Sequence, residues 1–491
     1  MKTKIPSLKK LNIMVKNRIV QYVGITLFTL LYTTACKVPS LVPKTENRKT
    51  PASYNNSQDS TNTAQLKWKE FYNDPYLTAL IDTALHNNQE LNMVLQEIEI
   101  SRNEIRVRRG EYLPFVGLKA GVGVDKVARY TNIGAMEATT EMKPGRAMPD
   151  PVPDFLGGAY ARWEIDIWNK LHNAQKAAVN RYLATVEGKN FVITSLVAEI
   201  ANSYFELLAL DNQLAILKQN IDIQTNALEI VRLQKQATRV TELAVRRFEA
   251  QVLNTRSLQY KIQQQITETE NRINFLLARY PQPIPRNDDS FNRLTPQAIQ
   301  AGLPSQLLAN RPDIKRAEQE LAAAKLDVQV AKAQFYPSLG ISAALGYRAF
   351  NPAYLIKTPE SILYSLAGEL VGPLVNRNAI KATYANANAK QIQAVYNYEK
   401  TILNAYFEVA NQMAKIGNLE QSYSLQEREV EALTQSTAIS NDLFQAARAD
   451  YMEVLLTQRD ALESKFELIE TKKQQLNAMV NIYQALGGGW N

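Results

Sequence analysis

Few side chains in this sequence have the chemistry that enzymes and metal sites need. The 491 residues include two histidines, His86 and His172, and one cysteine, Cys36. So small a set supports neither a zinc site nor a cysteine nucleophile with its base, and neither histidine has a visible partner. The two common glycine-rich nucleotide-binding loops are also absent from the sequence. Catalysis by Asp, Glu, Ser or Lys is not excluded, but no motif indicates it, so we expect no enzyme, no metal site and no cofactor.

Cys36 is the residue whose position predicts a covalent modification. It follows Thr33-Thr34-Ala35 at the end of an apolar run over residues 19–32. An apolar run of about 14 residues is too short to span a bilayer, and with basic residues before it the run is typical of a cleaved signal peptide. The junction resembles a bacterial lipobox, in which the cysteine is acylated, although Thr33 stands where the common pattern has leucine. An ordinary signal peptide with an incidental cysteine is the alternative.

The N-terminal segments account for most of the net charge of +8. Residues 1–35, the predicted signal peptide, contain six basic side chains and no acidic one, so the remainder has 50 basic and 48 acidic residues, or +2. A nearly neutral mature chain gives no electrostatic reason to expect nucleic acid as a partner. Residues 36–65 are rich in proline, serine, threonine and asparagine, which predicts a lipidated tether between an anchor and the body.

The body of the chain contains the same unit twice. Residues 88–123 recur as residues 311–346 at an offset of 223, and Asn202-Ser-Tyr-Phe-Glu recurs as Asn404-Ala-Tyr-Phe-Glu at an offset of 202. The 21 extra residues of the first copy are expected in its proline-rich loop over residues 136–155. This internal duplication predicts repeat 1 over residues 66–285 and repeat 2 over residues 286–491.

Each repeat contains two segments in which apolar residues alternate with small or polar ones. Strands of about ten residues with one apolar face match the wall of a membrane β-barrel, whose apolar face meets lipid. Two soluble hairpins packed on a core would show the same alternation, so the helices must decide between the two readings. Four strands cannot close a barrel, because closed barrels need about eight, and a barrel therefore requires several chains. The residues expected to face lipid include Leu118, Val122, Trp163, Ile341 and Leu345.

Helical spacing extends over residues 77–109 before the first strand and over about 171–237 and 380–447 after the two hairpins. About seventy residues at 1.5 Å each form a rod of about 100 Å. Apolar residues repeat in two adjoining stripes, so each rod is expected to contact neighbours on both sides, as in a wall of coiled-coil pairs. The second rod is predicted to be one heptad longer than the first. The hairpin tips, where the rods turn back, are Thr238, Arg239 and Val240 in repeat 1 and Ala447, Arg448 and Ala449 in repeat 2.

Several short motifs lie in a fixed order along this pattern. They are Asp166-Ile-Trp, Leu303-Pro-Ser-Gln-Leu-Leu-Ala-Asn-Arg-Pro-Asp-Ile, Phe335-Tyr-Pro-Ser-Leu, Val454-Leu-Leu-Thr-Gln-Arg and Leu486-Gly-Gly-Gly-Trp. With the duplication, the chain resembles the outer-membrane factor family, the TolC-like outer membrane efflux proteins. The resemblance is strongest to the lipoprotein branch that serves resistance-nodulation-division drug efflux systems.

This resemblance implies a fold and an assembly. The fold class would be a mixed α and β membrane protein, a homotrimer in which four strands per chain form a 12-stranded β-barrel. A long periplasmic α-helical coiled-coil barrel would continue it, and residues 281–303 would form an equatorial linker between the repeats.

The resemblance also implies a function. The protein would be the outer-membrane channel of a tripartite efflux pump in a Gram-negative bacterium, giving passive exit to drugs and other small molecules. Its partners would be a periplasmic adaptor protein at the hairpin tips, an inner-membrane proton-driven efflux transporter and outer-membrane lipid. The alternatives are the exit duct of a type I protein secretion system and a non-channel structural envelope lipoprotein.

The resemblance places a gate near the second tip. In the family, inward-facing charges on the returning helix hold the tunnel shut, often in a motif that reads Leu-Asp-Ala-Gln-Arg. This sequence has Leu455-Leu-Thr-Gln-Arg, so Leu456 replaces the acid and Arg459 remains. Asp450 and Glu453 lie one to two turns earlier and could supply the anionic ring instead. The alternative is that Asp450 is a helix N-cap and Glu453 a solvated surface charge.

Overall fold

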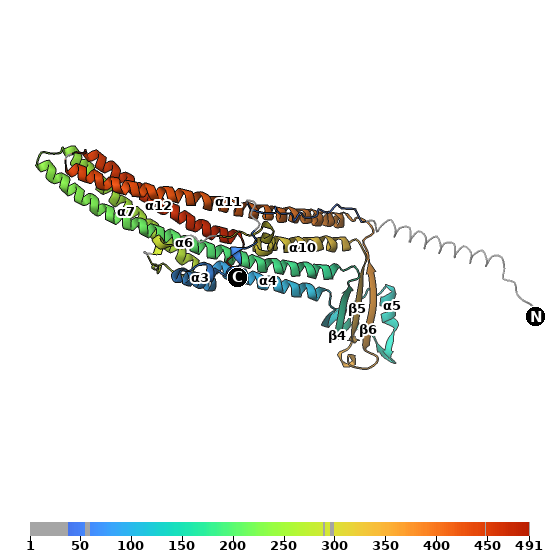
Figure 1. Ribbon diagram of the computed structural model, residues 1–491. Helices are drawn as coiled ribbons and strands as arrows, with labels where there is room; N and C mark the ends of the chain where they lie inside the picture. Colours follow the sequence, from blue (N-terminus) through green and yellow to red (C-terminus); the bar gives the residue numbers. More distant parts are fainter. Residues whose placement is uncertain (1–37, 55–58, 288–289, 295–298, 447, 491) are drawn as a thin grey trace, which may run out of the picture. The chain divides into compact units, whose positions relative to one another are not determined.

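The computed structural model describes residues 38–54, 59–287, 290–294, 299–446 and 448–490 (Figure 1). The predicted signal peptide and Cys36 lie outside the described residues. The chain forms two compact units, each of which takes residues from both repeats. The first unit contains Met1–Thr45, Ser101–Tyr182 and Glu320–Val395, and the second contains Glu46–Ile100, Leu183–Gln319 and Tyr396–Asn491.

Four antiparallel strands form the main sheet of the first unit, in the order β1-β4-β5-β6 (Figure 1). The predicted hairpins are the pairs β1 with β4 and β5 with β6, and the pairing of β4 with β5 joins the two repeats. Within the described residues, β1 and β6 each pair on one side only, which leaves two open sheet edges. The strands are β1 (Phe115–Asp125), β4 (Val152–Ile165), β5 (Ser338–Ala349) and β6 (Ile362–Val371).

The connections inside the two hairpins differ in length. The paired residues Val122 and Phe155 are 33 positions apart, and their counterparts Leu345 and Tyr364 are 19 apart. The hairpin therefore carries 14 of the 21 extra residues, and the other seven lie between Phe155 and Asn202. The prediction that the loop carries all of them is wrong. The longer connection contains α5 (Asn132–Thr139), β2 (Glu141–Lys143) and β3 (Arg146–Ala147).

Helices make up most of the rest of the described chain. The long ones are α3 (Pro75–Asn87), α4 (Gln89–Glu111), α6 (Lys170–Gln236), α7 (Glu242–Leu276), α10 (Pro312–Ala333), α11 (Asn378–Gln445) and α12 (Tyr451–Ala485). The short ones are η1 (Thr63–Gln65), α2 (Trp68–Phe71), α8 (Ser290–Arg293), η2 (Pro304–Gln306), α9 (Leu307–Asn310) and η3 (Pro352–Tyr354).

The helix predicted over residues 77–109 is two helices. Asn88 ends α3 with extended backbone, at φ −56° and ψ 128°, and its Oδ1 accepts a hydrogen bond from the Leu91 N–H at 2.9 Å. Asn88 therefore caps the helix that follows, as an asparagine at this position can. The apolar spacing alone did not reveal the break, because it continues across it.

Both predicted rods are present as α6 and α11. The prediction that the second is a heptad longer is wrong for the helix as a whole, since α6 has 67 residues and α11 has 68. Beyond the shared markers Asn202 and Asn404, α11 does extend seven residues further than α6. It begins six residues closer to its marker, however, so the two differences nearly cancel.

The core of the second unit is built on α6. The side chains of Ile200, Tyr204 and Leu208 are fully buried in one cluster with Leu77 of α3 and Tyr483 of α12. An 18-residue window of α6 is apolar enough to cross a membrane, and 61% of that window is buried. Its apolar character therefore matches packing against other helices, as the two predicted stripes require.

The described part of the predicted tether lies against helices. In the first unit, Gln391 Nε2 donates to the carbonyl oxygen of Lys44 at 2.8 Å. In the second unit, the buried ring of Tyr54 stacks on Tyr406 with 5.4 Å between ring centroids. The segment thus contacts helices at these points, and its role as a tether for a lipid anchor stays a prediction.

Candidate functional site

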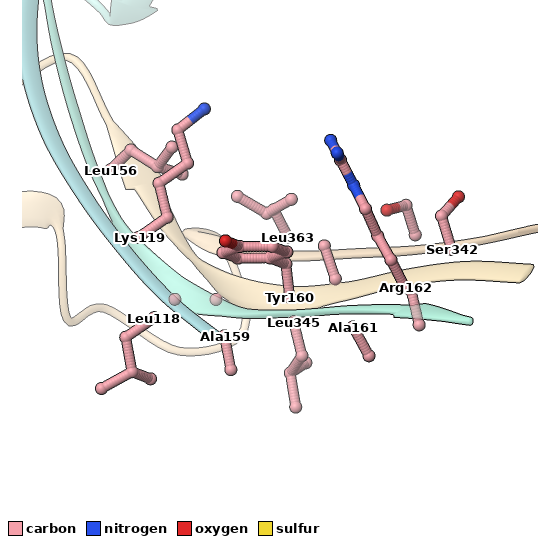
Figure 2. Close-up of a pocket in the computed structure, with 15 residues that line it drawn as sticks. Leu118, Lys119, Leu156, Ala159, Tyr160, Ala161, Arg162, Ser342, Leu345 and Leu363 are labelled. Atoms are coloured by element: carbon pink, nitrogen blue, oxygen red, sulfur yellow. The ribbon is translucent and has the colours of Figure 1, made fainter. Parts of the chain in front are cut away.

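The sheet of the first unit has one apolar face that crosses all four strands. Cross-strand pairing places Leu118, Ala159, Leu345 and Tyr364 in one row, and directly paired residues share a face. In Figure 2 the side chains of Leu118, Ala159 and Leu345 point to the same side of the sheet. Leu118 is 87% exposed, Val122 79% and Leu345 63%. An apolar face this exposed indicates a surface that meets lipid or another protein.

The other two residues predicted to face lipid belong to the same face. Trp163 pairs directly with Ile341, two residues along each strand from the pair of Ala161 with Ala343. Trp163 is 40% exposed, and its Nε1 donates to the carbonyl oxygen of Tyr112 at 3.0 Å. All five predicted residues therefore share one face, and their contact with lipid stays a prediction.

The opposite face of the sheet carries most of its polar side chains, together with Leu156 and Leu363. Figure 2 shows Lys119, Tyr160 and Arg162 pointing away from the apolar face. On the same face, Arg348 of β5 binds Asp154 of β4 through two hydrogen bonds of 2.8 and 2.9 Å. This bidentate geometry is the strong form of an arginine–carboxylate contact. The four strands thus combine an apolar and a polar surface, as the sequence predicts.

The junction between β4 and α6 gives His172 the partner that the sequence did not reveal. His172 Nδ1 lies 2.6 Å from Asp166 Oδ2, and the His172 backbone N–H donates to the same oxygen at 2.8 Å. The His172 ring also stacks on Tyr112 with 4.3 Å between ring centroids. Burial tends to raise the pKa of Asp166, but the hydrogen bonds from His172 outweigh it and lower the pKa. The expectation that His172 has no partner is wrong, and Asp166 anchors a structural joint.

The first hairpin tip is held by ion pairs between α6 and α7. Lys235 of α6 pairs with Glu242 of α7, and this hydrogen bond is the main influence that lowers the pKa of Glu242. Within α7, Arg246 also pairs with Glu242 at 2.8 Å and with Glu249 at 2.9 Å. The connection itself contains the predicted tip residues Thr238, Arg239 and Val240, of which Thr238 has a positive φ of 53°.

The second hairpin tip has fewer such contacts. Ala447 lies outside the described residues, and Arg448 and Ala449 lead into α12. Asp450 occupies the N-cap position of α12, but its side chain accepts no capping hydrogen bond. Among the described residues, Arg448, Asp450 and Glu453 form no ion pair, and all three are exposed. The capping alternative for Asp450 therefore lacks the contact that it needs.

The other predicted gate residues lie further along α12. Leu456 is 41% exposed, and Arg459 Nη2 lies 2.8 Å from Asp460 Oδ1. The sequence did not point to Asp460, because the acids considered there were the one that Leu456 replaces and the earlier Asp450 and Glu453. Because residues four apart share a helix face, Asp460 presents an acid one turn beyond Leu456. The spacing of these two residues was the signal that could have found it.

The two tips lie side by side within the second unit (Figure 1). Val245 and Phe248 of α7 pack in one apolar cluster with Val454 of α12. Arg247 Nη1 also lies 2.7 Å from the sulfur of Met452. The α12 segment that carries the gate candidates therefore packs against the first hairpin on its buried side.

The Arg-Pro-Asp-Ile motif builds a buried junction in the second unit. Arg311 is 6% exposed, and its Nε and Nη2 bind Asp313 at 2.9 and 2.6 Å. Its Nη1 donates to Glu408 of α11 at 2.7 Å and to the carbonyl oxygen of Ala485 in α12 at 2.8 Å. One guanidinium thus joins α10, α11 and α12, a role that the sequence reasoning did not assign.

Together these features define a class of protein. The sheet has one apolar face, one more polar face and two open edges, as expected of one chain's part of an oligomeric membrane β-barrel. Long helical hairpins accompany the sheet in the same chain. Among the described residues, no group of three His, Cys, Asp or Glu side chains could hold a metal ion. The chain belongs to the outer membrane efflux protein family, whose model matches residues 80–279 and 303–488.

Individual proteins support this assignment. The chain is 29% identical to the pyoverdine export outer membrane protein OpmQ of Pseudomonas aeruginosa over 86% of this chain and 87% of that protein. It is 28% identical to the cation efflux system protein CusC of Escherichia coli O6:H1 over 86% and 88% of the two chains. Among solved structures, a crystal structure of CusC matches with a TM-score of 0.78 and 25% identity, over 92% of this chain and 99% of that one.

These findings confirm the predicted fold class and function. The chain has the fold of the trimeric outer-membrane efflux channels, with four strands per chain, long helices and an internal duplication. It is the outer-membrane channel of a tripartite efflux system and is located in the outer membrane. The family is one of channels and is not an enzyme family.

Proposed function

We propose that three copies of the chain close one 12-stranded barrel, in which the β1 edge of one copy pairs with the β6 edge of the next. The observation that carries this proposal is the sheet itself, which is apolar on one face of every strand and open at both edges. Exposed edges in a hydrocarbon layer would leave backbone groups without partners, and closure removes them. Four strands fall short of the roughly eight that a closed barrel needs.

In this assembly the apolar face meets outer-membrane lipid and the polar face lines a water-filled passage. Residues such as Val122 and Leu345 then lie in hydrocarbon, and Lys119 and Arg162 lie in water. Cys36 carries acyl chains that anchor the N-terminus, with each buried methylene contributing about 0.8 kcal/mol. Mass spectrometry of the mature protein that found a free Cys36 thiol would contradict this anchor.

The exposed hairpin tips dock a periplasmic adaptor protein. Arg239 and Arg448 offer a basic charge at each tip, and Val240 offers a partly buried apolar contact. The adaptor joins the channel to an inner-membrane proton-driven efflux transporter, which supplies the energy for export.

The gate of the resting channel lies at the start of α12. A three-fold axis brings Asp450 and Glu453 of three copies together as rings of like charge. Such rings repel unless they bind a cation, take up protons or pair with a neighbouring arginine such as Arg448 or Arg459. The exposed Leu456 offers apolar closure one turn further on.

Single cysteine substitutions test the barrel assignment directly. In a Cys36→Ser background, Val122→Cys and Leu345→Cys probe the apolar face, and Gly121→Cys and Ser342→Cys probe the polar face. A charged, water-soluble thiol reagent applied to purified trimers in vesicles is expected to label positions 121 and 342 and to leave 122 and 345 unlabelled. Arg239→Cys, at an exposed position of the first tip, is the control that must react. Ready labelling at 122 and 345, with none at 121 and 342, would invert the barrel.

A further inference from the structure

A shallow hollow of about 500 Å³ lies on the polar face of the sheet (Figure 2). Gly158 of β4 and Gly346 of β5 pair directly at its floor. A Cβ added to Gly158 would lie 2.6 Å from the carbonyl oxygen of Leu345, and one added to Gly346 would lie 2.5 Å from that of Gly157. Neither glycine can carry a side chain without moving a strand, so the floor is bare backbone.

Two cations and one aromatic ring rise beside this floor. Figure 2 shows Lys119 and Arg162 projecting from the same side of the sheet, with the ring of Tyr160 between them. The Arg162 guanidinium carbon lies 5.9 Å from the centre of the Tyr160 ring. The ring lies over Gly117, where an added Cβ would approach its Cε1 to 2.9 Å. The ring therefore covers the backbone with one face and turns the other toward the hollow.

The cations at the hollow have no acidic partner among the described residues. Neither Lys119 nor Arg162 forms an ion pair there. Two acids of the same face are already engaged, since Asp154 binds Arg348 and Glu164 binds Lys170. A positive charge on a concave, protein-lined surface attracts anions, because the low-dielectric wall concentrates its field.

We infer that this hollow binds small aromatic anions, in which a carboxylate, sulfonate or phosphate group is attached to an aromatic ring. Lys119 pairs with Gly158, four residues along β4 from Arg162, so each cation holds an anionic group of its own through charge-assisted hydrogen bonds. The ring of the ligand packs against the Tyr160 ring beside the Arg162 guanidinium, above the glycine floor. The inference rests on the proposed function, because this face lines the passage only in the closed barrel.

Each copy of the chain supplies one such site, so the passage has a belt of cations at the level of the hollow. The belt favours the exit of anionic aromatic compounds over cationic ones of the same size. The barrel itself would thus select among exported compounds by charge. The residues that do so are separate from the gate candidates of α12.

Current block in planar bilayers tests the site. Purified wild-type trimers with naphthalene disulfonate in the bath are expected to show reversible block, and ethane disulfonate, which lacks the ring, is expected to block less. Lys119→Gln with Arg162→Gln is expected to raise the dissociation constant of the naphthalene probe by about tenfold, since both charge-assisted contacts are lost. Tyr160→Leu is expected to abolish the preference for the aromatic probe.

The matched control is Lys126→Gln, which neutralises a cation on the β1–β4 connection that lies 3.5 Å from Asp150. The naphthalene probe is expected to block this variant as strongly as it blocks the wild type. If the double variant does not assemble, Lys119→Gln and Arg162→Gln are measured singly, and each is expected to weaken the block. Conducting channels whose block is equal in the wild type and the charge variants would overturn the site and leave the proposed function intact. Folded trimers that conduct neither as the wild type nor with the gate opened by Asp450→Ala and Glu453→Ala would overturn both the site and the proposed function.

Discussion

The two repeats build the same junction around different residues. Asn88 Nδ2 donates to the carbonyl oxygen of Leu276 in α7 at 2.9 Å, and the equivalent Arg311 donates to that of Ala485 in α12 at 2.8 Å. The shared requirement is a donor for a carbonyl group near the end of the returning helix, where intrahelical partners run out. Repeat 1 meets it with a neutral amide, and repeat 2 meets it with a buried guanidinium.

The guanidinium adds contacts that the amide cannot make. Arg311 also holds Glu408 of α11, whereas the equivalent Glu206 of α6 lies 3.5 Å from Arg272 of α7. Repeat 2 therefore has a buried link between three helices at one end of its long hairpin.

The tips show the opposite difference. In repeat 1, Lys235 of α6 pairs with Glu242 of α7, and in repeat 2 the charges Asp450 and Glu453 form no ion pair among the described residues. We infer from this contrast that the α11–α12 hairpin is fixed near Arg311 and is the more easily moved at its tip.

Removing the Arg311 guanidinium is expected to have the largest effect on stability and so tests the difference between the two junctions most strongly. Arg311→Ala leaves the buried site without its cation and two carboxylates without their partner, which costs about 3 kcal/mol in buried pairs of this kind. The thermal unfolding of purified trimers should shift down accordingly. Arg311→Lys keeps the charge but loses the bidentate contact with Asp313, so an intermediate shift is expected. An Arg311→Ala trimer as stable as the wild type would show that the link is not a fixed point.

The equivalent change in repeat 1 should be milder. Asn88→Ala removes one neutral hydrogen bond to Leu276 and the cap at the Leu91 N–H, for a cost of about 1 to 2 kcal/mol. Its unfolding temperature should fall between those of the wild type and Arg311→Ala. A loss of stability as large as that of Arg311→Ala would mean that the two junctions contribute equally to stability. The difference inferred between the repeats would then be wrong.

The sequence predicted the strands well because their pattern is local. A period of two fixes which residues share a face, so the apolar set around Leu118 and Leu345 could be assigned before any pairing was known. The long rods were equally accessible, since their apolar spacing extends over many turns. The break at Asn88 was not found, because a capping asparagine and a helical one differ only in backbone conformation.

The contacts of the candidate sites were harder to predict, because they join residues far apart in the chain. Arg311 finds Glu408 and Ala485 at separations of 97 and 174 residues. Asp166 and His172 are only six residues apart, but their contact depends on the turn between β4 and α6. Local patterns fix faces and helices, and the partners of buried charges follow only from the fold.

The central claim, that the lightly tied second tip is the gate, is tested by single-channel conductance. Asp450→Ala with Glu453→Ala removes both candidate rings, so folded trimers in planar bilayers should conduct more than the wild type, and cells should become sensitive to large antibiotics. Glu242→Ala, which removes the pairs of this carboxylate with Lys235 and Arg246 at the first tip, should leave the conductance unchanged. Wild-type conductance in well-folded double-variant trimers would contradict the claim and move the gate to apolar closure around Leu456.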